Sequence, residues 1–245
     1  MAALGLLAVA CGGDDDEPRV AAKAVIDPGD GGDYSPSIDP ADFAGVVEDN
    51  PYFPLQVGER WVYEGESDGE LEHDEVVVTD ARKQVLGIDV VVVRDTVSDA
   101  DGKVVEDTID WFAQDRNGNV WYFGEQSKDY EDGKVVSTHG SWEAGVDGAL
   151  PGIVMPATPR VGHAYRQEYR KGEAEDLAEI RRAGVHTVVP FGAFDDVVVT
   201  GDWNPLEPKV VEEKYYAPGV GMILETTTAG GTGRVELRSH TGGAA

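Results

Sequence analysis

Alternating strand-like runs, separated by turn-forming dipeptides, constrain the fold of this chain more than any other feature. Asn117-Gly118 and Asp132-Gly133 are hairpin turn signals, because Asn, Asp and Gly tolerate the positive φ angles of tight turns. The runs beside such turns alternate in polarity, as in residues 60–64, where Trp61 and Tyr63 share one face. Alternation with period two is typical of strands. The sequence therefore predicts a series of neighbouring antiparallel hairpins.

The expected fold is mainly β. We predict one domain over residues 50–238, with about ten antiparallel strands that form a curved sheet or open barrel, a long irregular central segment, and at most one or two short helices. No internal repeat has a regular period, which argues against a propeller or solenoid. Asp39 before Pro40 is typical of a helix start. Residues 173–182 fit either a helix, because their types favour one, or a polar strand, because strands flank them.

The central segment, residues 140–169, is rich in glycine and proline and contains few hairpin signals. A long irregular connection in a compact domain is usually functional or disordered. This one is too apolar for disorder, so we expect it to pack over the sheet as a lid.

The candidate binding residues lie in this segment. Trp142 could stack on a ligand ring, and Glu143 and Asp147 could orient a cationic or hydroxylated ligand or a metal ion. Tyr165 and Arg166 could line the same cavity, since an open sheet end with convergent polar groups is a usual place for a site. The alternative is structural: Trp142 and Met155 plug the open end of the sheet, and both acids face water.

The N-terminus predicts the location of the protein. Residues 2–10 are small or apolar and precede Cys11, and Leu7-Ala8-Val9-Ala10-Cys11 resembles the lipobox of bacterial lipoproteins. The apolar run is too short to span a bilayer but suits a signal-peptide core. The resemblance implies that residues 1–10 are a signal peptide and that Cys11 carries the lipid. The alternative is a chance cysteine in a disordered apolar terminus.

The segments around the β domain are polar. Residues 11–49 are acidic and turn-rich, so they cannot bury enough apolar surface to offset their conformational entropy. We expect them to form a flexible tether, and residues 239–245 to form a disordered tail. The protein would then be anchored by lipid on the extracytoplasmic face of the cell membrane.

Charge and cysteine content limit the functions. Lys and Arg total 20 against 47 Asp and Glu, a net charge of -27. Phosphate backbones would repel such a chain, so nucleic acid is not an expected partner. The acids either keep the protein soluble or attract cations such as Ca²⁺. Cys11 is the single cysteine, so the lipobox reading leaves no thiol for a disulfide, a thiolate metal site or a nucleophile.

Further resemblance supports the same location. Asn50-Pro51-Tyr52-Phe53-Pro54-Leu55 and Lys214-Tyr215-Tyr216-Ala217-Pro218-Gly219-Val220-Gly221, with residues 111–125, 140–169 and 189–195, resemble a largely uncharacterised group of secreted bacterial lipoproteins. The resemblance implies a cell-envelope β domain and supplies no catalytic residue.

Catalytic and metal motifs are few. The sequence holds no Gly-x-Ser-x-Gly elbow, His-Glu-x-x-His helix or P-loop, each of which would indicate a specific chemistry. Residues 115–119 resemble a calcium loop but lack its terminal Glu, and a hairpin turn explains them. We therefore expect no cofactor, with Ca²⁺ left open.

A module that binds a small apolar or mixed ligand, or an envelope protein, is favoured over catalysis. The alternatives are an envelope hydrolase with paired carboxylates near Glu143 and Asp147, and a structural surface domain.

Overall fold

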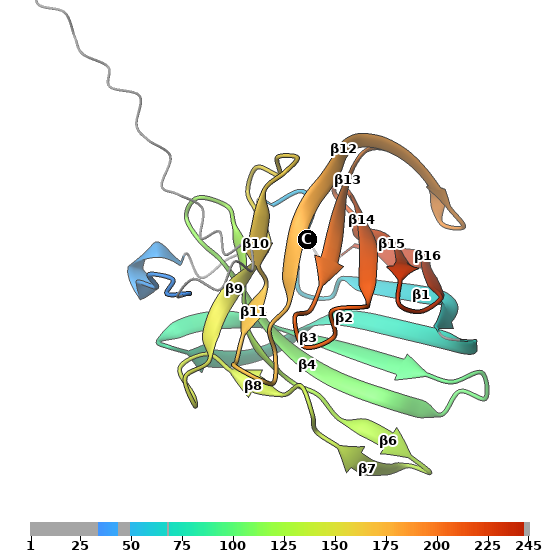
Figure 1. Ribbon diagram of the computed structural model, residues 1–245, viewed down its shortest axis with the longest axis horizontal. Helices are drawn as coiled ribbons and strands as arrows, with labels where there is room; N and C mark the ends of the chain where they lie inside the picture. The colour runs from blue at the N-terminus through green and yellow to red at the C-terminus, as the bar shows by residue number, and fades with distance from the viewer. Residues whose placement is uncertain (1–33, 44–49, 68, 243–245) are drawn as a thin grey trace, which may run out of the picture.

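The computed structural model describes residues 34–43, 50–67 and 69–242 (Figure 1). Within these residues the protein is almost entirely β, with one 3-10 helix, η1 (Pro40–Asp42), and no α-helix. The strands, in chain order, are β1 (Arg60–Ser67), β2 (Glu70–Val85), β3 (Ile88–Ser98), β4 (Val104–Gln114), β5 (Val120–Gln126), β6 (Asp129–Glu131), β7 (Lys134–Ser137), β8 (Trp142–Glu143), β9 (Leu150–Met155), β10 (Ala164–Arg166), β11 (Glu168–Tyr169), β12 (Leu177–Val189), β13 (Gly192–Trp203), β14 (Val211–Ala217), β15 (Gly221–Ala229) and β16 (Gly233–Thr241).

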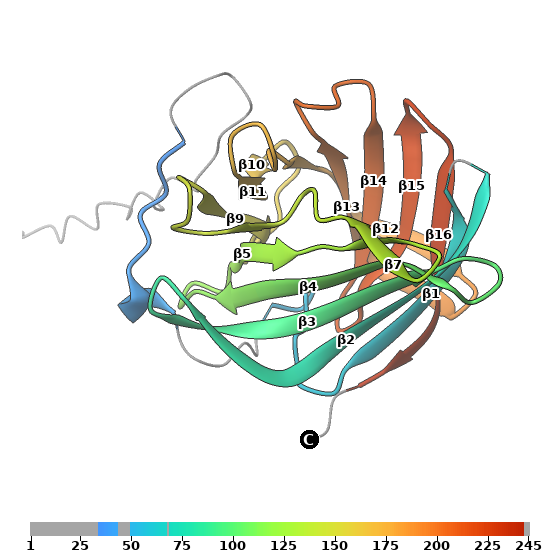
Figure 2. The same cartoon turned by 90° about the horizontal axis from the view of Figure 1, so that it is seen from below.

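These strands form one antiparallel sheet that is nearly closed into a barrel. The order of the main path is β10-β12-β13-β14-β15-β16-β1-β2-β3-β4-β5-β9-β11, and Figures 1 and 2 show its strong curvature. The first and last strands of this path, β10 and β11, are consecutive in the chain, with only Gln167 between them. One short stretch of backbone therefore joins the two ends of the sheet. The prediction of a single, mainly β domain with a curved sheet or barrel is confirmed.

The hairpins form where the turn dipeptides predict them. Gly118 has a φ of 89° in the turn between β4 and β5. Asp115 stabilises this turn, because its Oδ1 accepts hydrogen bonds from the backbone N–H groups of Asn117 (2.8 Å) and Asn119 (3.0 Å). Its Oδ2 accepts from Trp121 Nε1 at 3.0 Å. The residues that resemble a calcium loop thus form a hairpin turn.

The middle strands are buried on both faces. In β3, Val93 belongs to one apolar cluster, with Trp61, Phe112 and Leu237. Val90 and Val92 belong to a second cluster on the other face. A strand with apolar residues on both faces is covered on both sides, and this is why residues 87–94 form an almost continuous apolar run.

The central segment differs from the expectation. It packs against the sheet as predicted, but it contributes β8, β9, β10 and β11 to the barrel wall and is not a lid over it. These strands are two to six residues long, too short to show a clear alternation, and Pro151 and Gly152 in β9 hide the strand signal further.

Three segment boundaries are also now defined. Residues 177–189 form β12, so the strand alternative holds for most of the ambiguous region. Strand β16 runs to Thr241, into the expected tail. Of the expected tether, residues 34–43 lie on the barrel, where the ring of Phe43 packs edge-on against that of Phe123. Asp39 caps η1 through its side chain, as predicted. The signal peptide, Cys11 and most of the tether lie outside the described residues.

Candidate ligand-binding cavity

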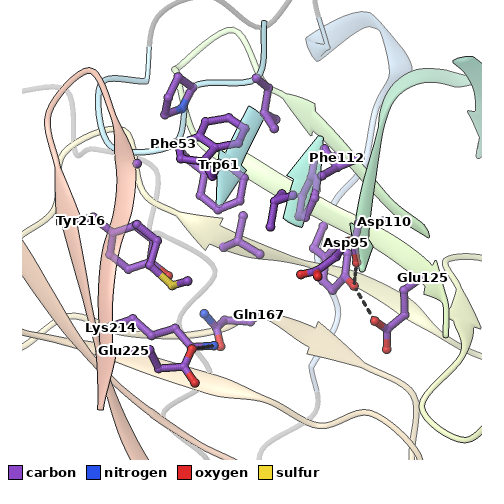
Figure 3. A pocket seen from close by; sticks show the side chains of 18 of the residues that line it. Phe53, Trp61, Asp95, Asp110, Phe112, Glu125, Gln167, Lys214, Tyr216 and Glu225 are labelled. Atoms are coloured by element: carbon purple, nitrogen blue, oxygen red, sulfur yellow. Dashed lines mark hydrogen bonds and ion pairs between the residues drawn. The ribbon is translucent and has the colours of Figure 1, made fainter. Parts of the chain in front are cut away.

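A cavity of about 530 Å³ lies inside the barrel. Strands β1 to β5 line one side and β14 and β15 line another. The wall is completed by residues 53–55, Val154, Gln167, Glu168 and Asp176. Figure 3 shows aromatic side chains, including Phe53, Trp61 and Phe112, along one part of the cavity. Polar side chains, including Lys214, Glu225 and Glu125, lie along another. The cavity thus has one apolar end and one charged end.

Hydrogen bonds to backbone carbonyls hold the aromatic wall in place. Trp61 Nε1 donates to the carbonyl of Val220 at 2.6 Å, and the Tyr63 hydroxyl donates to the carbonyl of Met222 at 3.0 Å. Phe53 packs on Phe112 with 5.2 Å between ring centroids. The polar atoms of Trp61 and Tyr63 are therefore satisfied, which leaves their ring surfaces to face the cavity.

The acidic wall follows from strand periodicity. Alternate residues of a strand point to the same face, and three neighbouring strands each place one acid two residues from one apolar side chain inside the barrel. These pairs are Asp74 and Val76 in β2, Val93 and Asp95 in β3, and Asp110 and Phe112 in β4. Each strand thus contributes to both ends of the cavity.

Burial makes these acids weak. Burial, with the nearby Glu125 carboxylate, raises the pKa of Asp110 well above its ordinary value. Burial also raises the pKa of Glu125 to about 7, although a hydrogen bond from Tyr122 opposes the shift. Burial and a neighbouring Asp176 raise the pKa of Glu168 as well. Groups with strongly shifted pKa values that share a cavity are typical of functional sites.

Lys214 is the only basic residue among those that line the cavity. Its Nζ lies 3.7 Å from Asp202 Oδ2 and 3.6 Å from Glu225 Oε2. Burial alone would lower the pKa of Lys214, but the Glu225 and Asp202 carboxylates outweigh it, and the pKa is raised well above its ordinary value. Lys214 is therefore a charged partner for these two acids.

Trp142 and Glu143 are consecutive residues of β8, and their side chains contact different partners. Trp142 is 4% exposed, and its Nε1 donates to Glu168 Oε2 at 2.7 Å. Glu143 forms an ion pair with Lys83 at 2.8 Å. Trp142 is thus part of the core beside the cavity, and the two residues do not form a joint site.

The other three predicted residues also lie outside the cavity lining. Asp147 is in a turn with a φ of 50°, and its exposed carboxylate is 3.7 Å from Arg170. Glu143 and Asp147 are therefore neutralised by different cations and are not arranged as a carboxylate pair. Tyr165 and Arg166 are buried in β10, and Arg166 lies over the ring of Tyr169. None of the five predicted residues is among those that line the cavity.

Part of the cavity lining could be predicted from the sequence. The Asn50 to Leu55 and Lys214 to Gly221 stretches, noted above for their resemblance, supply Phe53, Lys214, Tyr216 and Gly221 to the cavity. The acids of β2, β3 and β4 gave a local signal too, since each stands two residues from a Val or Phe in a strand. The sequence does not show which face of each strand points inward, so this pattern alone does not place the acids in a cavity.

Comparisons with known proteins assign no family. No protein-family model and no curated protein matches the chain. Among solved structures, a Bacteroides fragilis protein named as a candidate exported protein with a YmcC-like fold matches with 19% identity and a TM-score of 0.46. A Parabacteroides distasonis protein named as a candidate lipoprotein matches with 13% identity and a TM-score of 0.44. Each match covers 78% of this chain and 99% of the other. At such identities and TM-scores, these likenesses assign no function to this chain.

Proposed function

We propose that this protein is a lipid-anchored, extracytoplasmic binding protein whose barrel takes up a small ligand with both apolar and polar parts. The observation that carries the proposal is the interior cavity of about 530 Å³, with an aromatic wall and a cluster of buried acids. Ligand sites usually measure ~300–1,000 Å³ and combine apolar walls with a few polar groups. A structural domain would have no need of such a cavity.

The proposed location depends on the N-terminal sequence. Cys11 follows an apolar run and small residues, as lipidation requires in the lipoproteins that the sequence resembles. Within the part of the chain that the structure describes, no helix has the length and hydropathy to cross a bilayer. Replacing Cys11 with Ala should move the protein from the membrane fraction to the soluble fraction. Unchanged retention in the membrane would contradict lipid anchoring.

Ligand binding can be tested by blocking the cavity. Val154 lines it and is 8% exposed, so Val154→Trp should fill part of the space. We expect the full-length wild type to bind a fluorescent amphiphile such as 1-anilinonaphthalene or to carry a co-purified small molecule in native mass spectrometry. The variant should bind much less.

The matched control is Val136→Trp, on the exposed face of the β6–β7 hairpin. It should bind like the wild type, and circular dichroism should show that both variants are folded. Equal binding by the wild type and folded Val154→Trp would contradict an interior site, and so would the absence of any bound molecule from the wild type.

A further inference from the structure

We propose that the cavity selects organic cations, in which an ammonium or guanidinium group is attached to an apolar body. This inference deepens the proposed function and rests on it. The cation would lie among the buried carboxyl groups, and the apolar body would lie against the aromatic wall. The excess of acidic groups in the lining, the buried carboxyl oxygens of two of them and the placement of the aromatic rings support this inference independently.

Acidic groups far outnumber basic groups in the lining of the cavity. Seven lining residues carry a carboxyl group, against the single amine of Lys214: Asp74, Asp95, Asp110, Glu125, Glu168, Asp176 and Glu225. That amine already lies between Asp202 and Glu225. The remaining acids have no basic residue beside them in the lining. An isolated buried carboxylate is costly, so a cationic ligand would gain where an anionic one would be repelled.

Two of the acids also have buried carboxyl oxygens that receive no hydrogen bond from any other side chain or from the backbone of the described residues. These atoms, Oδ1 of Asp74 and Oδ1 of Asp95, are shielded from solvent. The two residues lie on neighbouring strands, where Asp95 pairs with Val76, two residues from Asp74. Buried polar atoms are nearly always hydrogen-bonded in folded proteins. A proton shared by the two acids can hydrogen-bond one carboxyl group to the other, and a ligand N–H group in the cavity would supply donors to both carboxylates in its place.

The two acids interact strongly with each other. Burial, followed by the charge of Asp95, raises the pKa of Asp74. Burial is also the main cause that raises the pKa of Asp95. The pair therefore retains a proton when no cation is bound. A cation bound beside it would stabilise both carboxylates and displace that proton.

The aromatic wall suits the apolar body and can also contact the charge. Trp61, Phe112 and Tyr216 line the cavity, and Figure 3 shows Asp95 and Asp110 beside Phe112. Cations are attracted to the faces of aromatic rings, most strongly to Trp. Both the carboxylates and the faces of the aromatic rings would therefore attract an ammonium group at this place.

A metal ion fits the cavity less well. Over the described residues, no three side chains of His, Cys, Asp or Glu are grouped so that they could hold a metal ion. Calcium takes six to eight oxygen ligands, and the apolar wall offers none. An organic cation uses both ends of the cavity, whereas an ion would use only one.

The test compares three probes that share an octyl chain: octylammonium, octanol and octyl sulfate. Binding to the full-length protein is measured by calorimetry below the micelle concentrations, and calcium alone is the fourth arm. We expect the ammonium probe to bind at least ~10-fold tighter than octanol, a difference of ~1.4 kcal/mol. Octyl sulfate should bind more weakly than octanol, and calcium should not displace the ammonium probe.

Two variants test whether Asp74 and Asp95 cause the preference for the ammonium probe. Asp95→Asn and Asp74→Asn keep the side-chain size and remove charge, so each should reduce the preference for the ammonium probe over octanol several-fold. The matched control, Glu131→Gln, lies at the exposed end of β6 and should not change it. Preserved preference in both folded variants would overturn the inference.

The outcomes separate the two proposals. If octanol binds as tightly as the ammonium probe, the cation inference fails and the ligand-binding proposal remains. If calcium displaces the ammonium probe, the acids form a metal site and the inference also fails. If no probe binds and native mass spectrometry finds no bound molecule, the proposed function itself fails.

Discussion

The hydroxyl of Tyr122 donates a 2.6 Å hydrogen bond to Oδ1 of Asp110, a carboxyl group buried inside the barrel. Tyr122 and Asp110 lie on neighbouring strands, β5 and β4. The same hydroxyl is 3.0 Å from Glu125 Oε2. One phenol group therefore lies between two acids that both face the cavity.

Replacing this phenol should affect both stability and ionisation. Tyr122→Phe leaves two buried carboxyl groups without a hydrogen-bond partner, which costs about 1–3 kcal/mol in the free energy of unfolding. Because the Tyr122 hydrogen bond lowers the pKa of Glu125, its loss should raise that pKa above about 7. Urea denaturation and NMR titration of the Glu125 carboxyl would measure the two effects.

A matched control for this change is Tyr130→Phe, because Tyr130 lies in β6, away from the acids of the cavity. It should leave both the stability and the Glu125 titration close to those of the wild type. The interpretation fails if Tyr122→Phe and Tyr130→Phe behave alike in both measurements.

The stability of the empty barrel should fall as pH rises. The pKa of Glu125 is higher in the folded protein, at about 7, than its ordinary value of 4.5. The folded state therefore binds the proton more tightly, and this stabilisation is present below ~4.5 and lost as pH rises through about 7. The effect is on the order of 3 kcal/mol, since one pKa unit corresponds to ~1.4 kcal/mol. The groups that act on Glu125 are Tyr122, Glu106, Asp176, Asp95 and Asp110.

Chemical denaturation between pH 4.5 and 8 would measure this dependence, and Glu125→Gln should make it shallower. Glu75 is a suitable control, because a hydrogen bond from Arg60 lowers its pKa, which is the opposite shift. Glu75→Gln should retain the fall in stability with rising pH. An unchanged slope in Glu125→Gln would show that Glu125 is not responsible.

The sequence predicted the fold from local features. Hairpin turns such as Asn117-Gly118 and alternation such as Trp61 and Tyr63 depend on residues close together in the chain, so the strands between them could be recognised. The wall formed by residues 142–169 could not be, because its strands are short and contain Pro151 and Gly152. Their pairing depends on strands outside the segment: β9 pairs with β5, which lies before the β6–β7 hairpin in the chain, and β10 pairs with β12.

The site was not predicted for a related reason. Asp74 and Asp95 face Lys214 and Glu225 across the interior only because the sheet curves until β14 and β15 lie opposite β2 and β3. Sequence periodicity gives the face of a strand but not which face is inside a closed barrel. Trp142 is a large residue in a segment that looks irregular in the sequence, and its hydrogen-bond partner, Glu168, is 26 residues away.

Closure of the barrel should depend on Gly152. A Cβ atom at this position would lie 2.3 Å from the carbonyl carbon and oxygen of Gln167 and 2.5 Å from the carbonyl oxygen of Arg166. Backbone atoms cannot rotate away, so Gly152→Ala should separate β9 from β11 and lower the free energy of unfolding by about 2 kcal/mol or more. Hydrogen exchange should show faster exchange at Tyr169, which pairs with Leu150 of β9, whereas the Glu168 N–H donates to the carbonyl of Asp176.

The control for this change is Gly192→Ala. A Cβ at Gly192 would meet only the ring of Phe194, at 3.7 Å, which is ordinary contact. This variant should keep wild-type exchange rates in β9 and β11. If Gly152→Ala were equally stable and equally protected, the close approach at Gln167 would not be needed for closure.

Lys214 should be essential to the stability of the acidic wall. Lys214→Met removes the cation that lies within 4 Å of Asp202 and Glu225, and breaking a buried ion pair typically costs about 3–5 kcal/mol. Because the Lys214 and Glu225 side chains are 28% and 27% exposed, we expect a smaller loss, of roughly 2 kcal/mol. Asp202→Asn in the same chain should restore part of this loss by removing one unpaired charge.

Lys103→Met, at a side chain that is 69% exposed, is the control and should change the urea midpoint little. A Lys214→Met protein as stable as Lys103→Met would mean that water or protonation already neutralises these acids, so that Lys214 is not their required partner.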